Sequence, residues 1–154
     1  MARKITIEQF SDYLRGAVEG VPDAMTRAIS VCCQKISDDI KADMAHTIRD
    51  QNRTYYTHNT TKAHHPSAPG NPPAPDTGNL RKSIRFEICD RGKSSVYGLV
   101  GSTQKEPPYG SYLECGTSKI APRPWLRPAL EKNKEFIETA LKEALPEIFS
   151  GGGE

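Results

Sequence analysis

Hydrophobic residues recur at helical spacing in the first third of the chain, in two stretches. The first stretch has apolar residues at steps of three and four: Phe10, Leu14, Ala17 and Val18. Thr6 and Gln9 match a helix capping box, and Gly20 with Pro22 favours a helix end. Residues 1–21 are therefore predicted to form a short N-terminal helix, or arm, that docks on a neighbour. Phe10 is its candidate contact.

The second stretch carries the longest hydrophobic stripe of the sequence. Its apolar residues again repeat at steps of three and four: Met25, Ile29, Cys33, Ile36, Ile40, Met44 and Ile48. Charged residues fill the opposite face, which is typical of an amphipathic helix. Pro22 and Asp23 suit a first helical turn, so a long helix is predicted over residues 22–51.

The periodicity disappears over residues 52–76. This segment has almost no aliphatic residues and carries five prolines between Pro66 and Pro75. Such a composition buries too little apolar area to offset the entropy lost on ordering. We therefore expect an extended Pro-rich loop that becomes ordered on assembly, with Tyr55 and Tyr56 as candidate anchors.

Alternating residues predict a small antiparallel sheet within residues 77–127. Gly78 permits the backbone turn that ends the loop. Strands are expected at Leu80–Ile88, Ser95–Ser102 and Tyr109–Cys115, and a turn at 90–93 joins the first two. In the third strand Leu113 and Cys115 would face the core. Gly98 and Gly101 indicate a bulge or a close approach of the backbone.

A corner rich in proline follows the third strand. Pro122, Pro124 and Pro128 hold the backbone extended around Trp125. Whether Trp125 packs in its own core or contacts a neighbouring subunit stays open at this point. Glu114 is expected to form a cross-strand or intersubunit ion pair with Arg123 or Arg127, or else a surface ion pair that contributes little.

The last helix is expected over residues 128–149, because Pro128 suits its first turn. Its apolar stripe comprises Leu130, Phe136, Ile137, Leu141, Leu145 and Ile148. The step from Leu130 to Phe136 is imperfect, and Pro146 is expected to kink or end the helix. Residues 150–154 are expected to form a flexible tail.

Together these elements predict one α+β domain. A small antiparallel sheet of about three or four strands would pack against the long N-terminal-half helix and the C-terminal helix, with a long Pro-rich loop. A chain of 154 residues fits a single domain. Apolar residues make up only 36% of it, so either a sizeable part of the chain is not packed, as the loop indicates, or some surface is buried only in a complex.

The residues capable of chemistry show no pattern of an enzyme or a metal site. The four cysteines are predicted to be reduced and buried: Cys32, Cys33, Cys89 and Cys115. His58, His64 and His65 lack the spacing of a zinc site. A hydrolase built on Cys115 is disfavoured, because no base is placed beside the thiol. We expect no catalytic residues, no metal and no cofactor.

Charge and hydropathy restrict the remaining classes. The net charge of +2 is too small to attract nucleic acid through bulk charge. No signal core and no run of about 18 apolar residues occurs, so we expect a soluble protein made in a cytosol, without membrane association. A small module that binds DNA non-specifically is the alternative function, using basic residues near the hairpin and the corner: Arg81, Lys82, Arg85, Arg91, Lys93, Lys119, Arg123 and Arg127.

Three short motifs follow one another along the second half of the chain. The first comprises Thr77, Gly78, Leu80, Ser83 and Ile84. The second comprises Tyr109, Tyr112, Glu114, Gly116 and Thr117. The third comprises Pro122, Pro124, Trp125, Leu126, Pro128, Ala129 and Leu130. Their order and spacing resemble the tail-completion, or head–tail joining, family of long-tailed bacteriophages, whose members are minor tail or neck proteins.

The resemblance implies a structural role and gives no catalytic residues. It implies a virion protein, made in the host bacterial cytoplasm, that forms a homo-oligomeric ring, a hexamer, at the head-proximal end of the tail. Other neck and tail proteins would be its partners, with possible non-specific contact to DNA in the channel. Cys115 stands where the family often has an aromatic residue, and Trp125 replaces a commoner Phe. Candidate subunit contacts are Phe10, Tyr55, Tyr56, Arg123, Trp125 and Arg127.

Overall fold

The structure, a computed structural model, describes residues 7–56, 63–90, 96–103 and 109–150, without the side chains of residues 7–22, 55, 90 and 146–150. Helices are combined with small strand pairs, so the predicted α+β class is confirmed. The chain divides into two compact units. The first unit comprises Met1–Cys33, Glu87–Leu99 and Lys134–Glu154, and the second comprises Gln34–Phe86 and Val100–Asn133.

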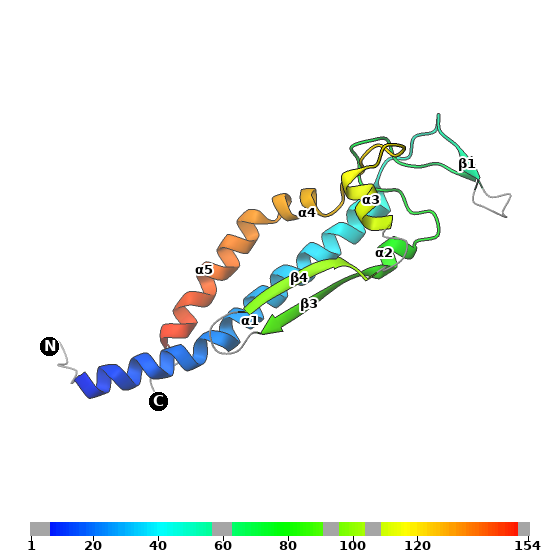
Figure 1. Cartoon of the computed structure of the whole chain (residues 1–154). Coiled ribbons are helices and arrows are strands. Elements are labelled where there is room, and N and C mark those ends of the chain that lie inside the picture. Colours follow the sequence, from blue (N-terminus) through cyan, green and yellow to red (C-terminus); the bar gives the residue numbers. More distant parts are fainter. Residues whose placement is uncertain (1–6, 57–62, 91–95, 104–108, 151–154) are drawn as a thin grey trace. The chain divides into compact units, whose positions relative to one another are not determined.

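Helix α1 (Ile7–His46) is continuous over 40 residues (Figure 1). The prediction of two helices separated at Gly20 and Pro22 is therefore wrong. Glycine and proline lower helix propensity by about 1 and 3 kcal/mol. Apolar residues nevertheless continue across both positions at steps of three and four: Val18, Val21 and Met25. An uninterrupted stripe outweighs local propensity, because packing supplies most helical stability. The predicted cap residue Thr6 lies outside the described residues.

The segment after His46 sets the end of α1. Thr47 Oγ1 donates a hydrogen bond to the Pro72 carbonyl at 2.9 Å, and Arg49 Nη2 donates one to the Pro75 carbonyl at 3.1 Å. The helix therefore stops short of its predicted end, because the chain turns toward the Pro-rich segment instead.

The predicted hydrophobic stripe of α1 is buried over most of its length. Met25 and Ile29 are half-buried, and the next four members are buried: Cys33, Ile36, Ile40 and Met44. Ile48 is 80% exposed, because it lies beyond the helix end. The spacing therefore predicted the buried face correctly wherever the helix exists.

In the first unit, the buried apolar side chains that the structure describes are small. They come from α1 and from α5 (Lys134–Ser150): Ala24, Ala28, Cys32, Cys33 and Ala144. Strand β4 (Val96–Ser102) approaches α1 at Gly98, where a Cβ atom would overlap Cys33 Sγ and lie 2.9 Å from Ile29 Cγ2. The predicted close approach is thus confirmed at Gly98, whereas a Cβ atom at Gly101 would have nothing within 4 Å.

Two separate strand pairs occur among the described residues. In the second unit β1 (Tyr55–Tyr56) pairs antiparallel with β2 (Ala63–His64), so part of the predicted loop is a short ribbon. Strand β3 (Ile84–Asp90) is the neighbour of β4. Only residues 91–95 join β3 and β4, so the pair is antiparallel, since a parallel pair needs a much longer crossover. The predicted turn at 90–93 lies mostly outside the described residues.

Two short helices stand where strands were predicted. Helix α2 (Asn79–Ser83) precedes β3, and helix α3 (Tyr109–Cys115) replaces the expected third strand. The predicted three-stranded meander is therefore wrong. Both helices belong to the second unit and position the motif residues described below for the corner.

The predicted last helix is divided at Asn133 into α4 (Arg127–Lys132) and α5. The imperfect step from Leu130 to Phe136 marks this break. Helix α5 continues beyond Pro146, so the predicted helix end there is wrong. The buried positions are Ala129 and Ala144, while members of the predicted stripe are exposed: Leu130, Phe136 and Leu145. Residues 151–154 and the side chain of Ile148 lie outside the described part.

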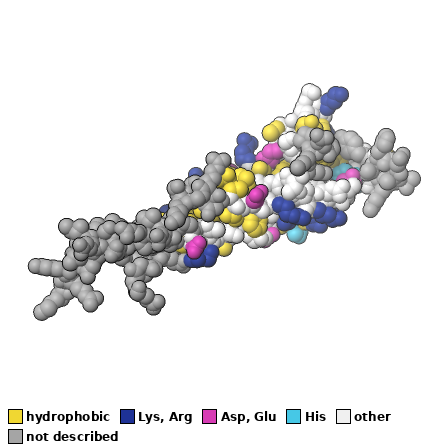
Figure 2. Space-filling model, turned by 60° about the horizontal axis from the view of Figure 1, so that its bottom comes forward, with side chains coloured by type: hydrophobic (Ala, Val, Ile, Leu, Met, Phe, Trp, Pro, Cys, Tyr) yellow, Lys and Arg dark blue, Asp and Glu magenta, His cyan; other side chains and the backbone are white. Residues whose placement is uncertain are grey.

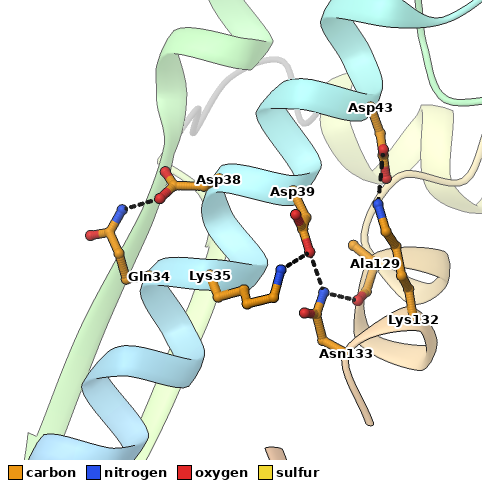
Figure 3. A network of polar contacts seen from close by, with 8 residues as sticks. All are labelled: Gln34, Lys35, Asp38, Asp39, Asp43, Ala129, Lys132 and Asn133. Carbon is orange, nitrogen blue, oxygen red and sulfur yellow. Dashed lines mark hydrogen bonds and ion pairs between the residues drawn. The ribbon is translucent and has the colours of Figure 1, made fainter. Parts of the chain in front are cut away.

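A polar network joins α4 to α1 within the second unit (Figure 3). Asn133 is buried, and its Nδ2 donates to Asp39 Oδ2 and to the Ala129 carbonyl, both at 2.8 Å. Lys35 and Lys132 form ion pairs with Asp39 and Asp43 at 3.1 and 3.3 Å. Burial alone would raise the pKa of Asp39, but the bonds from Asn133 and Lys35 outweigh it and lower that pKa. The break at Asn133 thus supplies a side chain that fixes α4 on α1.

Candidate functional site

The residues of the three motifs meet in one corner of the second unit, built from α2, α3 and the start of α4. The corner begins with α3, whose buried residues Gly110 and Leu113 are three positions apart. That spacing places both on one helical face. A seven-residue segment fits strand alternation as well, and glycine does not count as apolar in a pattern. The strand prediction therefore failed.

Glu114 closes the corner by accepting three consecutive backbone hydrogen bonds. Its Oε2 accepts from Trp125 N at 2.7 Å and Leu126 N at 2.9 Å, and its Oε1 accepts from Arg127 N at 3.0 Å. These are the only N–H groups between Pro124 and Pro128, since proline has none. A carboxylate at the start of α4 also suits the positive end of the helix dipole.

The expected ion pair between Glu114 and an arginine is not formed. Glu114 is engaged with backbone N–H groups, and Arg123 is directed elsewhere. Arg123 is buried, and its Nε donates to the Ser67 carbonyl at 3.0 Å. Its backbone N donates to the Leu113 carbonyl at 2.6 Å. Arg123 therefore supports the fold, and its buried side chain offers little surface for the predicted subunit contact.

Trp125 packs in the core of its own unit, with only 5% of its surface exposed. Its Nε1 donates to the Gly110 carbonyl at 2.9 Å. A Cβ atom at Gly110 would lie 3.2 Å from both Leu80 Cδ1 and Trp125 Cζ2. One residue from each motif segment therefore meets at Gly110. The open question about Trp125 is answered in favour of the core.

The first motif shapes the entry into β3. Gly78 has a φ of 76°, the left-handed conformation that glycine tolerates best, as predicted for a turn. Thr77 Oγ1 accepts from Asn79 N at 3.3 Å. Ser83 Oγ donates to the Leu80 carbonyl at 2.7 Å, and the next residue, Ile84, is fully buried. Each residue of this motif therefore has a structural task.

Gly116 and Thr117 form the turn that leads out of α3. Gly116 has a φ of 75°, and a Cβ atom there would lie 2.9 Å from the Ile120 carbonyl oxygen and 3.0 Å from Pro122 N. Thr117 Oγ1 accepts from the backbone N of Lys119 and of Ile120. Only glycine fits this position, because both its conformation and its surroundings exclude a side chain.

The Pro-rich segment is fixed to the corner through its backbone carbonyl and N–H groups. Proline lacks an N–H, so such a segment mainly offers acceptors. The Ser67 carbonyl accepts from Arg123, and Gly70 N donates to the Pro122 carbonyl at 2.9 Å. The segment that was predicted to await assembly is thus hydrogen-bonded within its own chain where it is described.

A hollow of about 330 Å³ lies beside the corner, lined by the segment 73–79 and by residues that include Leu80, Tyr109 and Leu113. Burial raises the pKa of Tyr109, while the charge of Arg123 acts in the opposite direction. Nearby, burial lowers the pKa of His64, although Asp76 at 3.7 Å acts against this shift.

The remaining predicted contact residues have mixed positions. Tyr56 is 72% exposed and Arg127 is exposed, so both stay candidates for a subunit contact. The side chains of Phe10 and Tyr55 lie outside the described part. Tyr112, a motif residue, is 42% exposed.

Tyr109 and Tyr112 point to a surface that sequence reasoning missed. They lie three positions apart on α3 and are 45% and 42% exposed. The missed signal was the helical spacing of these two tyrosines, which alternation had placed on opposite faces of a strand.

The cysteines differ in exposure, and the described histidines form no metal site. Cys32 and Cys33 are buried as predicted, whereas Cys89 is half-buried and Cys115 is exposed, so the prediction for Cys115 is wrong. In the described part of the chain, no three His, Cys, Asp or Glu side chains gather as a metal site would require. His58 lies outside that part.

Within the described residues, no helix has the length and apolar character needed to cross a membrane.

The comparisons with known proteins show no relationship to any of them. No protein-family description matches the chain, and no curated protein and no solved structure is significantly similar to it.

Proposed function

We propose that the protein is a structural virion subunit that completes the head-proximal end of a long phage tail and allows the filled head to join it. It would act as one member of a homo-oligomeric ring, a hexamer, with neck and tail proteins as partners. The proposal rests on the motif resemblance together with the way the fold uses the motif residues.

The observation that carries this proposal is the meeting of all three motif segments at Gly110 and Glu114. Leu80, Gly110 and Trp125 pack together, and Glu114 binds the backbone of the third segment. Most motif residues thus serve the architecture of the corner, while Tyr109, Tyr112 and Leu130 of the same motifs stay exposed. Such a pattern supports a building-block role, because a shared motif of this kind preserves a shape.

The exposed face of α3 supports the ring part of the proposal. Tyr109 and Tyr112 lie on this face, and Leu130 on the neighbouring α4 is 50% exposed. A ring interface is heterologous, so each subunit must present apolar surface that a different patch on the next subunit covers. Tyrosine is well suited to such contacts, since it buries a large apolar body and keeps its hydroxyl hydrated.

Assembly of the purified protein tests the interface. The double variant Tyr109→Ser/Tyr112→Ser should remain folded by circular dichroism and Trp125 fluorescence but should lose the ring in sedimentation and electron microscopy. The matched control Lys119→Ser changes an exposed polar residue of the same unit and should assemble normally. Normal rings from the double variant would place the interface elsewhere.

Particle assembly tests the function itself. Tails made without the protein should accumulate apart from filled heads, and added protein should bind one tail end and restore joining. If tails that lack the protein still join heads, and the protein neither forms rings nor binds tail ends, the proposed function is wrong.

A further inference from the structure

A basic hollow of about 600 Å³ lies on the second unit, lined by Lys41 of α1, Arg81 and Lys82 of α2, and Arg85 of β3. Among the described residues, its lining contains no acidic and no aromatic side chain. In Figure 2 a group of Lys and Arg side chains is visible near the lower middle of the view, and others are scattered over the same surface. Arg81, Lys82 and Arg85 lie within five positions of one another, and the fold brings the distant Lys41 to them.

The charges of this basic hollow are not neutralised by carboxylates. Among the described residues, none of Lys41, Arg81 and Lys82 forms an ion pair, whereas other lysines of the chain do, such as Lys35 with Asp39. Arg85 Nη1 donates to the carbonyls of Lys82 and Ile84, which fixes its guanidinium group in place. Gathered like charges repel one another, so the basic hollow favours a bound anion.

The residue types of the lining restrict which kind of anionic partner can bind there. Arginine binds phosphate through two parallel hydrogen bonds, and lysine binds it as a point charge. An acidic protein surface would also need apolar residues to bury at the interface, and the lining has none. A single strand would need aromatic residues on which its bases stack, and these are absent too. Contact with the phosphate backbone of a DNA duplex requires only positively charged side chains, and the lining supplies these.

We propose that the basic hollow binds the phosphate backbone of double-stranded DNA without reading base sequence. This site is narrower than the basic set predicted from the sequence: Arg123 is buried in the corner, and Arg91 and Lys93 lie outside the described residues. Lys41 is the member that sequence reasoning missed. The inference does not depend on the proposed function, since it rests only on the charges of this hollow.

Fluorescence anisotropy with a short labelled DNA duplex tests the proposal between about 50 and 200 mM salt. Four phosphate contacts predict that log K falls with log salt at a slope of about −3.6, roughly a hundredfold loss over this range. In the variant Arg81→Gln/Lys82→Gln the slope should fall to about −1.8, with binding at low salt at least tenfold weaker. The control Lys119→Gln/Lys134→Gln removes the same charge from exposed positions elsewhere and should keep the parent slope.

Three results would overturn the proposal. The first is no duplex binding by the parent protein at about 50 mM salt. The second is an equal loss of binding in the control variant, which would mean that only net charge matters. The third is tighter binding of single-stranded DNA or of polyglutamate, which would assign the basic hollow to another partner. A parent protein that forms rings and restores head joining but does not bind duplex DNA would refute this inference alone. A parent protein that binds duplex DNA but neither forms rings nor restores joining would refute only the proposed function.

Discussion

Replacing Glu114 tests whether one side chain holds the corner together. Glu114→Ala leaves the backbone N–H groups of Trp125, Leu126 and Arg127 without their acceptor. The exposed Arg127 can bind water instead, so its N–H loses little. The part-buried N–H groups of Trp125 and Leu126 are harder to hydrate, and an unsatisfied buried donor costs about 1–3 kcal/mol.

The free energy of unfolding should fall by about 2–4 kcal/mol in Glu114→Ala. This range adds about 1–3 kcal/mol for the buried N–H of Trp125 to a smaller share from Leu126. Loss of the charge at the start of α4 contributes about 0.3–1 kcal/mol more. Glu114→Gln keeps one oxygen as an acceptor but loses the charge and presents an NH₂ group to the backbone. The free energy of unfolding of Glu114→Gln should therefore lie between the values of the parent and of Glu114→Ala.

Urea unfolding followed by circular dichroism and by Trp125 fluorescence measures these values. Trp125 is the only tryptophan and lies in the corner, so its emission reports the corner directly. The control Glu131→Ala removes an exposed carboxylate from the same α4 and should change stability by less than about 0.5 kcal/mol. If Glu114→Ala also stays within about 0.5 kcal/mol of the parent, the three hydrogen bonds do not hold the corner.

Three further predictions follow from the packing and the pKa shifts. Gly110→Ala should destabilise by about 1–3 kcal/mol, because its Cβ atom would crowd Leu80 and Trp125, whereas Gly101→Ala, with nothing within 4 Å, should be near neutral in thermal unfolding; equal effects would contradict the close packing at Gly110. Ellman's reagent should modify the exposed Cys115 in the native protein, while Cys32 and Cys33, whose pKa values are raised by burial, should react only on unfolding; rapid reaction of Cys33 would refute its burial. Burial lowers the pKa of His64 in the folded state, outweighing Asp76 with help from the charges of Arg49, His65 and Arg123, so stability should be full above about pH 6.5 and fall below it as the unfolded state takes up the proton. His64→Gln should reduce that fall in urea titrations, and an unchanged pH profile would show that His64 does not cause it.

The sequence predicted most of α1 because its signal is long. Apolar residues repeat over several turns, and this repeated spacing determined the buried face from Cys33 to Met44. The helix-breaking residues Gly20 and Pro22 led to the wrong prediction of a helix end. Their low local helix propensity did not outweigh the long apolar stripe. Period and length together were thus the most informative feature of the chain.

The corner could not be predicted in the same way, because long-range contacts define it. Gly110 is buried only because Leu80 and Trp125 pack against it, and no local pattern reveals that. Arg123 binds a carbonyl 56 positions earlier in the chain, at Ser67. Residues of all three motif segments meet in this corner, whereas periodicity predicted a strand where α3 lies.

In this protein, the residues that hold the corner together differ from the residues available to contact partners. Both oxygens of Glu114, the indole N–H of Trp125 and the guanidinium of Arg123 are engaged inside the second unit. Partner contacts must therefore use residues that the corner does not need.

The outer face of α3 and the basic hollow meet this requirement, because their side chains are exposed, apart from the half-buried Lys41. Substitutions at Tyr112 or Lys82 should change assembly or DNA binding while leaving the unfolding free energy nearly unchanged. Substitutions at Glu114 or Gly110 should lower stability first and affect partners only through the loss of folded protein. A variant of Tyr112 that unfolds the corner, or one of Glu114 that blocks assembly while fully stable, would contradict this separation.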